Sequence, residues 1–406
     1  MRMRSGFFLL TVGLLLTVGL LLLAPSETLA QRKGGTLRGA FGSDPPTLDP
    51  AQATDTTSSA VIRQIFDGLL ELDEKLNVVP AIAERWTVSK DQRVYTFHLR
   101  RGVRFHNGRE ARASDVKFSF ERAARGKRPW VFEKIAGARE LIRGAAKEIA
   151  GVRVVDDDTV EITLERPFAP FLHLVAYAAA SIVPREEAEK RGTAFASHPV
   201  GTGAFRFVSW RRDDQVVLEA FRDHFRGAPR LDRIVFRVIP AEITRFNEYR
   251  AGNLDVSDIP TGHCRAAQTD PVLKSEAAVW PILGTHAVRF NVEKPPFTDR
   301  RVRQAFGHAI DSSAIVGGLL EGCVVHGRGI LPPGMPGFTP DVAGTPFDSD
   351  RARRLLAEAG FPGGKGLPPV TYHYNTSDLN QRIAELIQSQ VKEVGIRLEL
   401  RRLDWA

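Results

Sequence analysis

The sequence lacks the residue patterns on which many enzymes depend. Its ten histidines include no HExxH pair, and no GxSxG motif accompanies them, so a zinc protease or a serine hydrolase of those types is not indicated. No nucleophile with a neighbouring base can be assigned. We therefore predict a protein that is not an enzyme and needs no cofactor. An exported hydrolase, whose catalytic groups only the fold brings together, remains as an alternative.

Lysine is also scarce. Of the 56 Lys and Arg residues only 12 are lysines, and no long basic run is present. The net charge of +8 and the isoelectric point near 9.6 therefore indicate a solvated, arginine-biased surface and no nucleic-acid partner. At 406 residues the chain is long enough for two or three domains.

The first 30 residues have the features of an export signal. Arg2 and Arg4 precede an apolar run over residues 7–24, and the segment ends in the small residue Ala30. We predict a signal peptide at residues 1–30, cleaved near Ala30, and a periplasmic protein. An uncleaved membrane anchor stays open as an alternative because the run approaches the thickness of a bilayer. No cysteine lies near the cleavage point, so a lipoprotein anchor is not available.

The most informative stretch runs from Val79 to Phe120. Residues 81–86 predict a short amphipathic turn, whereas residues 94–99 alternate with the period of a half-buried strand. Asn107-Gly108 then predicts a tight turn, and Ser114-Asp115 predicts the start of a helix. Taken alone, these patterns indicate a packed scaffold and no chemistry.

The order of these residues resembles family 5 of the extracellular solute-binding proteins of bacterial ABC importers, the dipeptide, oligopeptide and nickel-binding group. The matching residues are Ala83-Glu84-x-Trp86, Tyr95-Thr96-Phe97-x-Leu99-Arg100, Gly102-Val103-x-Phe105-x-x-Gly108 and Asp115-Val116-x-Phe118. Two later matches are Pro199-Val200-Gly201-Thr202-Gly203-Ala204-Phe205 and Pro296-Phe297-x-Asp299-x-x-Val302-Arg303-Gln304-Ala305. The function is therefore an implication of this resemblance.

The resemblance implies an α/β protein with the two-lobe, type II periplasmic binding protein fold and an extra peripheral subdomain. The expected first lobe comprises residues 31–56 and 166–285, the peripheral subdomain residues 57–165, and the second lobe residues 286–406. Because family members ordinarily continue further, we expect the second lobe to be incomplete. We also expect the 406-residue chain to be poorly soluble or to bind its ligand weakly unless it is extended.

The implied function is the capture of a peptide or similar small polar solute between the lobes and its delivery to an inner-membrane permease by a monomeric protein. A nickel- or haem-binding carrier of the same fold is the alternative. The loop over residues 374–379 has no Arg, which some relatives use to bind a peptide carboxylate, so a dipeptide is less favoured than a longer peptide or another polar solute.

The resemblance also implies a set of ligand-binding residues. They are Ala53, Thr54, Asp55, Thr56, Asn291, Asn375, Thr376, Ser377 and Trp405. We expect the segment 375–377 to face Thr54 and Asp55 across the cleft. From the residues alone, Asp55 is more readily explained as a helix cap than as a partner for a cationic ligand.

Cys264 and Cys323 leave three states open: a disulfide, two free thiols, or a metal site completed by His263 and His326. The resemblance places Cys264 after the last helix of the first lobe and Cys323 beyond a helix of the second. A bond between them would tie the lobes together. We therefore predict that the cysteines are unbridged and that no metal is bound.

Overall fold

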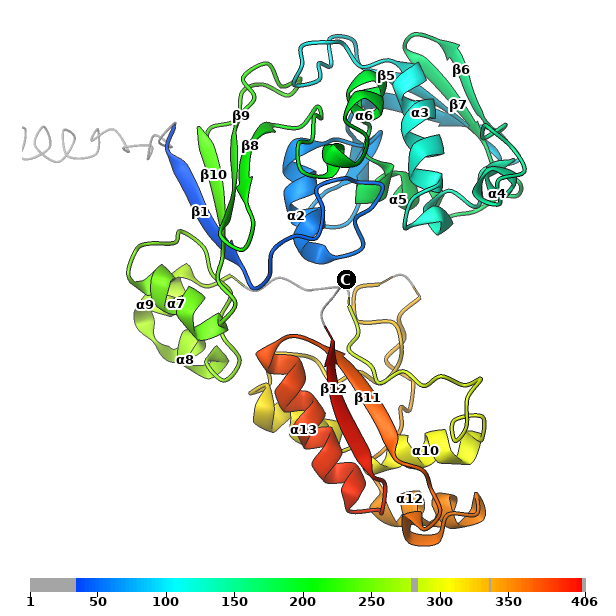
Figure 1. Ribbon diagram of the computed structural model, residues 1–406, viewed down its shortest axis with the longest axis vertical. Coiled ribbons are helices and arrows are strands. Elements are labelled where there is room, and N and C mark those ends of the chain that lie inside the picture. Colours follow the sequence, from blue (N-terminus) through cyan, green and yellow to red (C-terminus); the bar gives the residue numbers. More distant parts are fainter. Residues whose placement is uncertain (1–33, 279–283, 336, 404–406) are drawn as a thin grey trace, which may run out of the picture.

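The computed structural model describes residues 34–278, 284–335 and 337–403, and it is a mixed α/β structure as predicted. The structure has two separate hydrophobic cores. The larger one is formed by residues between Leu48 and Ile234, and the smaller one by residues between Val302 and Leu398. Residues 34–278 are called the N-terminal part below, and residues 284–403 the C-terminal part (Figure 1). The predicted signal peptide lies outside the described residues.

The first sheet of the N-terminal part has the strand order β1-β10-β9-β8. Its strands are β1 (Thr36–Phe41), β8 (Phe205–Arg211), β9 (Gln215–Ala220) and β10 (Arg233–Val238). β1 pairs with β10 in parallel, and the other pairs are antiparallel. The helices that follow β10, namely α7 (Glu242–Arg250), α8 (Cys264–Thr269) and α9 (Pro271–Glu276), gather at one end of this sheet (Figure 1).

A second sheet has the order β4-β5-β7-β6. Its strands are β4 (Ala83–Val88), β5 (Val94–Leu99), β6 (Val152–Asp156) and β7 (Thr159–Thr163), and helix α3 (Ala113–Ala124) packs on β6 and β7. The predicted alternation in β5 is confirmed, because Tyr95, Phe97 and Leu99 are buried. The predicted turn at residues 81–86 is wrong: Trp86 lies in β4 opposite Phe97, and such cross-strand aromatic pairs stabilise a sheet.

Shorter elements complete the N-terminal part. They are the hairpin of β2 (Leu70–Leu72) and β3 (Val78–Pro80), the helices α2 (Thr56–Ile65), α4 (Ala138–Ile142), α5 (Phe171–Val175) and α6 (Arg185–Arg191), and the 3-10 turns Pro129–Val131, Ala178–Ala180 and Gly192–Ala196.

The glycine pair Gly201 and Gly203 packs against the end of α2. The amide of Gly203 donates to the carbonyl of Ile65 at 2.8 Å. A Cβ at Gly203 would lie 2.5 Å from the carbonyl oxygen of Gln64, and one at Gly201 would lie 2.1 Å from that of Ile65. These glycines therefore allow a tight backbone path, because a side chain at either position would collide with backbone.

The C-terminal part is built on two parallel strands, β11 (Val370–Asn375) and β12 (Leu398–Leu403). Its helices are α10 (Arg300–Ala309), the short α11 (Ser312–Ala314) with the π turn Ile315–Leu319, α12 (Ser349–Glu358), and α13 (Asp378–Lys392), with a 3-10 turn at Pro362–Gly364. Val302, Ala305 and Phe306 form an apolar stripe along α10 and are buried. None of the helices in the described residues combines the length and apolarity that a bilayer-spanning helix requires.

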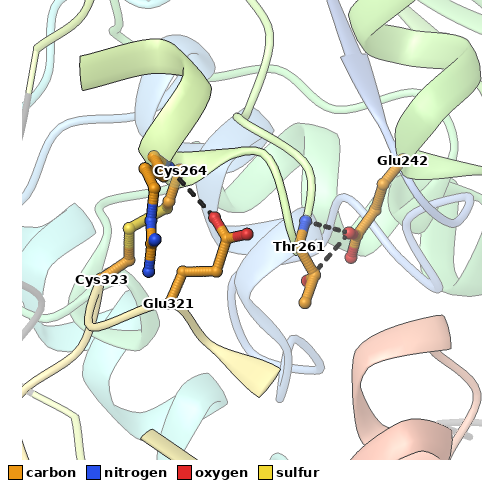
Figure 2. The surroundings of a disulfide bond; sticks show 6 residues. Glu242, Thr261, Cys264, Glu321 and Cys323 are labelled. Atoms are coloured by element: carbon orange, nitrogen blue, oxygen red, sulfur yellow. Dashed lines mark hydrogen bonds between the residues drawn. A yellow bond between two sulfur atoms is a disulfide. The ribbon is translucent and has the colours of Figure 1, made fainter. Parts of the chain in front are cut away.

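Cys264 and Cys323 form a disulfide, so the prediction that they are unbridged is wrong (Figure 2). The prediction placed the cysteines apart because they belong to different parts of the chain. The structure brings their Cα atoms to 6.2 Å, because α8 and the turn after Leu319 meet where the two parts adjoin. The alternative metal site with His263 and His326 is overturned with it, since bridged sulfurs are not thiolate ligands.

Candidate functional site

The first predicted ligand segment, residues 53–56, ends the loop that leads from β1 to α2. Helix α3 and the segment that follows it hold this loop in place. Arg122 of α3 donates to both oxygens of the nearly buried Asp49 carboxylate, at 2.7 and 2.6 Å. The amide of Lys127 donates to the carbonyl of Ala51 at 2.9 Å. The proline-rich loop therefore has a defined course although it has no regular structure.

Arg128 holds the ligand segment itself. Its Nε donates to the carbonyl of Ala53 at 3.0 Å, and its Nη2 donates to the carbonyl of Thr54. The guanidinium lies 5.3 Å from the ring centre of Tyr177, which packs at 5.6 Å against Trp130, a side chain that is 45% exposed. The sequence predictions missed Arg128 and these two aromatic residues, because no periodicity or motif marks a residue that reaches a loop 74 positions earlier.

Asp55 is the N-cap of α2, as its residue type suggested. Its Oδ1 accepts a hydrogen bond of 2.7 Å from the amide of Ser58. The second oxygen, Oδ2, is enclosed and has no partner among the described residues. Thr54 is half-buried and Thr56 is exposed. The segment thus presents one uncompensated carboxylate oxygen at the start of a helix, which a hydrogen-bond donor or a cation could satisfy.

The second predicted segment lies between β11 and α13. Asn375 ends β11, and Ser377 caps α13 by accepting from the amide of Asn380 at 3.2 Å. The amide of Thr376 donates to the carbonyl of Leu403 at 3.0 Å, so the segment is also tied to β12. Asn375 and Thr376 are exposed. Their polar side chains are therefore placed at the carboxyl end of a small parallel sheet.

Two predicted residues are not placed in these segments. Asn291 is an exposed residue in a turn before α10, where its side chain accepts from the amide of Glu293 at 3.1 Å. Trp405 lies outside the described residues.

The two segments share one design, a strand followed by a capped helix. Figure 1 shows the carboxyl ends of β1, β11 and β12 directed toward the region between the two parts. Ligands of α/β proteins commonly bind at the carboxyl ends of strands, near helix N-termini. That the segment 375–377 faces Thr54 and Asp55 across a cleft stays a prediction.

A small, shallow cavity lies elsewhere, inside the C-terminal part. Its lining includes Phe290, Phe297, Phe306 and Tyr372, together with Arg289. Burial raises the pKa of the Tyr372 phenol. None of the eight predicted ligand residues that the structure describes lines this cavity, so it is a gap beside the smaller core and is separate from the candidate site.

The candidate site offers hydrogen bonding and charge. Among the described residues, no group of three or more His, Cys, Asp or Glu side chains is arranged to hold a metal ion. The polar groups of the two segments are carbonyl, hydroxyl, amide and carboxylate groups, which suit a polar organic ligand.

Residues 77–406 match the family model described as "Bacterial extracellular solute-binding proteins, family 5 Middle". The chain belongs to this family. A glutathione-binding protein, GsiB, of Salmonella choleraesuis is 32% identical over 367 residues, which cover 90% of this chain and 69% of that protein. The dipeptide-binding protein of Escherichia coli is 32% identical over 371 residues, covering 86% of this chain and 68% of the relative.

A solved structure of a peptide-binding protein agrees with the fold. The murein tripeptide binding protein MppA of Escherichia coli superposes with a TM-score of 0.84 at 28% identity, covering 93% of this chain and 76% of that one. The predicted periplasmic-binding-protein fold is therefore confirmed, and the protein is a solute-binding protein of the ABC-importer type.

Proposed function

We propose that this family 5 protein binds a peptide, or a similar small polar solute, in the periplasm and presents it to an inner-membrane permease. The observation that carries the proposal is its 32% identity to a glutathione-binding and to a dipeptide-binding protein over most of its length. The two strand-to-helix segments at residues 53–56 and 375–377 would supply the ligand contacts. Ligand binding between them would draw the two parts together, and the permease would read the closed form.

Asp55 is proposed as the group that meets the positive end of the ligand. The support is its unpartnered Oδ2, since its Oδ1 is already engaged by the helix amide. A peptide amino group carries both the charge and the donors that this oxygen lacks.

A thermal-shift screen of the full-length protein tests the ligand class. Glutathione, di- to pentapeptides and nickel would be compared at equal concentrations. A ligand at 100 times its dissociation constant stabilises the native state by about 2.7 kcal/mol. A shift with peptides supports the proposal, and a shift with nickel alone contradicts it.

An Asp55→Asn variant tests the assigned contact. Asparagine also caps helices, so the variant keeps the bond to the Ser58 amide while it removes the charge. We expect peptide affinity to fall about tenfold or more, consistent with the loss of one charge-assisted hydrogen bond. Asp270→Asn, at the cap of α9, is the matched control and should leave affinity unchanged. Equal affinities in the wild type and in both variants would show that Asp55 does not contribute to ligand binding.

A further inference from the structure

The Cys264–Cys323 disulfide joins two bodies that are each anchored firmly to their own core. On the N-terminal side, Cys264 begins α8 three residues after Thr261. The amide and hydroxyl of Thr261 both donate to one carboxylate oxygen of Glu242, at 3.1 and 3.2 Å (Figure 2). His263, which lies between Thr261 and Cys264 in the sequence, packs against the buried ring of Phe246 on α7. Cys264 is therefore held to helix α7.

Helix α7 is in turn held to the first sheet. Glu248 of α7 forms an ion pair of 2.6 Å with Arg237 of β10. Asp255, after the helix, forms a two-point ion pair with Arg38 of β1, and its amide donates to the carbonyl of Arg38 at 2.8 Å. Because these contacts reach both β1 and β10, Cys264 moves with the sheet of the N-terminal part.

Cys323 is held to the C-terminal part in the same way. Its amide donates to the carbonyl of Leu320 at 2.9 Å, at the end of the turn that contains the buried Ile315 of the smaller core. Just before this turn, at the cap of α11, the amide of Asp311 donates to the side chain of Gln390 on α13 at 3.0 Å. Cys323 therefore moves with α13 and the core beneath it.

One further contact crosses beside the disulfide. The amide of Arg265 donates to the carboxylate of Glu321 at 3.0 Å. The disulfide and this hydrogen bond lie within two residues of each other on both segments. These two bonds, called the crossing below, therefore connect the two parts within one small region.

We propose that the Cys264–Cys323 disulfide is a hinge pin, which confines the relative movement of the two parts to rotations about an axis passing close to it. The Cα atoms of bridged cysteines cannot separate beyond about 7 Å, and here they lie at 6.2 Å. A rotation about a nearby axis preserves that distance, whereas a translation of one part away from the other would break the bond. The inference stands on the anchoring contacts and not on the identity of the ligand.

Distance measurements between spin-labelled non-natural amino acids in the full chain test the hinge pin. One pair, Gln268 on α8 and Val325 after Cys323, reports on the crossing, and both positions are exposed. A second pair, Lys90 after β4 and Arg354 on α12, also exposed, reports on the opening between the parts. We expect a narrow distribution for the first pair in the oxidised protein, and one at least twice as wide in the Cys264→Ser/Cys323→Ser variant.

Reduction after folding gives the same comparison if the double variant does not fold. An excess dithiol transfers two electrons and two protons to the bond, which leaves two thiols on the protein and a cyclic disulfide in the reagent. The exposed Cys323 makes this reduction feasible in the native state.

Two results overturn the proposal. One is an unchanged distribution for Gln268 and Val325 after the bond is removed, which would show that other contacts hold the crossing. The other is two free thiols in the oxidised, unfolded protein, counted by mass after alkylation. A broadened first pair together with an unchanged circular dichroism spectrum supports the hinge pin.

Discussion

His106 lies where the turn after residue 105 meets the glycine pair that packs on α2. Its Nδ1 accepts from the amide of Gly201 at 3.3 Å, and the nitrogen Nε2 lies 2.9 Å from the carbonyl of Gly203, to which it donates. The ring packs edge-on against Phe221. Burial lowers the pKa of His106 from 6.5 to about 4, so the imidazole is neutral in the folded protein at physiological pH.

This pKa predicts acid sensitivity. Between pH 6.5 and 4 the unfolded chain binds the proton and the folded protein does not, so stability falls as the pH is lowered through this window, by up to about 3 kcal/mol for this one group. Urea unfolding of the wild type and His106→Gln across the window measures the effect. The variant should show a shallower dependence on pH, whereas a variant of the exposed His173, His173→Gln, should follow the wild type.

The ion pair of Arg122 with Asp49 predicts a second residue effect. Arg122→Ala leaves a nearly buried carboxylate without its cation, and we expect a loss of about 3–5 kcal/mol in unfolding free energy. Arg185→Ala breaks an ion pair whose side chains are 66% and 55% exposed, and should cost under about 1 kcal/mol. Chemical denaturation of both variants measures the two losses of unfolding free energy. Equal losses would show that the burial of Asp49 does not increase the cost of removing its partner.

At the scale of the element, Gly203 shows how closely the segment before β8 packs against the end of α2. Gly203→Ala would place a Cβ against the backbone of Gln64 and Ile65, which cannot move aside like a flexible side chain. We expect a loss of at least about 2 kcal/mol. In Gly317→Ala, by contrast, the new methyl group meets open space, and the midpoint of thermal unfolding should not fall. A Gly203→Ala protein as stable as the wild type would contradict the close approach.

Elements with a strong period could be predicted from the sequence. The apolar patterns over residues 203–210, 216–220 and 233–239 predict strands, and that over residues 348–360 predicts a helix. Strands β8, β9 and β10 and helix α12 begin and end within two residues of these ranges, because alternating or helical apolar patterns fix the buried face. The apolar pattern over residues 383–394 also predicts a helix. Helix α13 begins five residues before this range, at Asp378, since Ser377 caps a polar first turn that has no apolar signal.

Contacts between distant segments could not be predicted in this way. The disulfide joins residues 59 positions apart. Arg128, in the segment that follows α3, donates to the carbonyls of Ala53 and Thr54. Side chains that serve as long-range connections carry no local period, so their partners emerge only when the fold is known. For the candidate site, the residue types of the two segments could be read from the sequence. The long-range contacts that hold these segments in place could not.

At the scale of the whole molecule, the disulfide joins residues 59 positions apart and closes a loop that contains the passage from one part to the other. The entropy lost by the unfolded chain predicts a stabilisation of about 4 kcal/mol for a loop of this length. Urea unfolding with and without a dithiol should therefore show this difference in the wild type. The Cys264→Ser/Cys323→Ser variant should not respond to the dithiol, and a wild type that does not respond either would contradict the prediction.

The parallel pairing of β1 with β10 has a consequence for biogenesis. Thr36 pairs with Arg233, so β1 has to wait for a partner that is made 197 residues later. At synthesis rates of about 5–20 residues per second this delay is on the order of 10–40 s. During that time β1 cannot complete its sheet. The topology therefore leaves β1 without its partner strand until most of the N-terminal part has been synthesised.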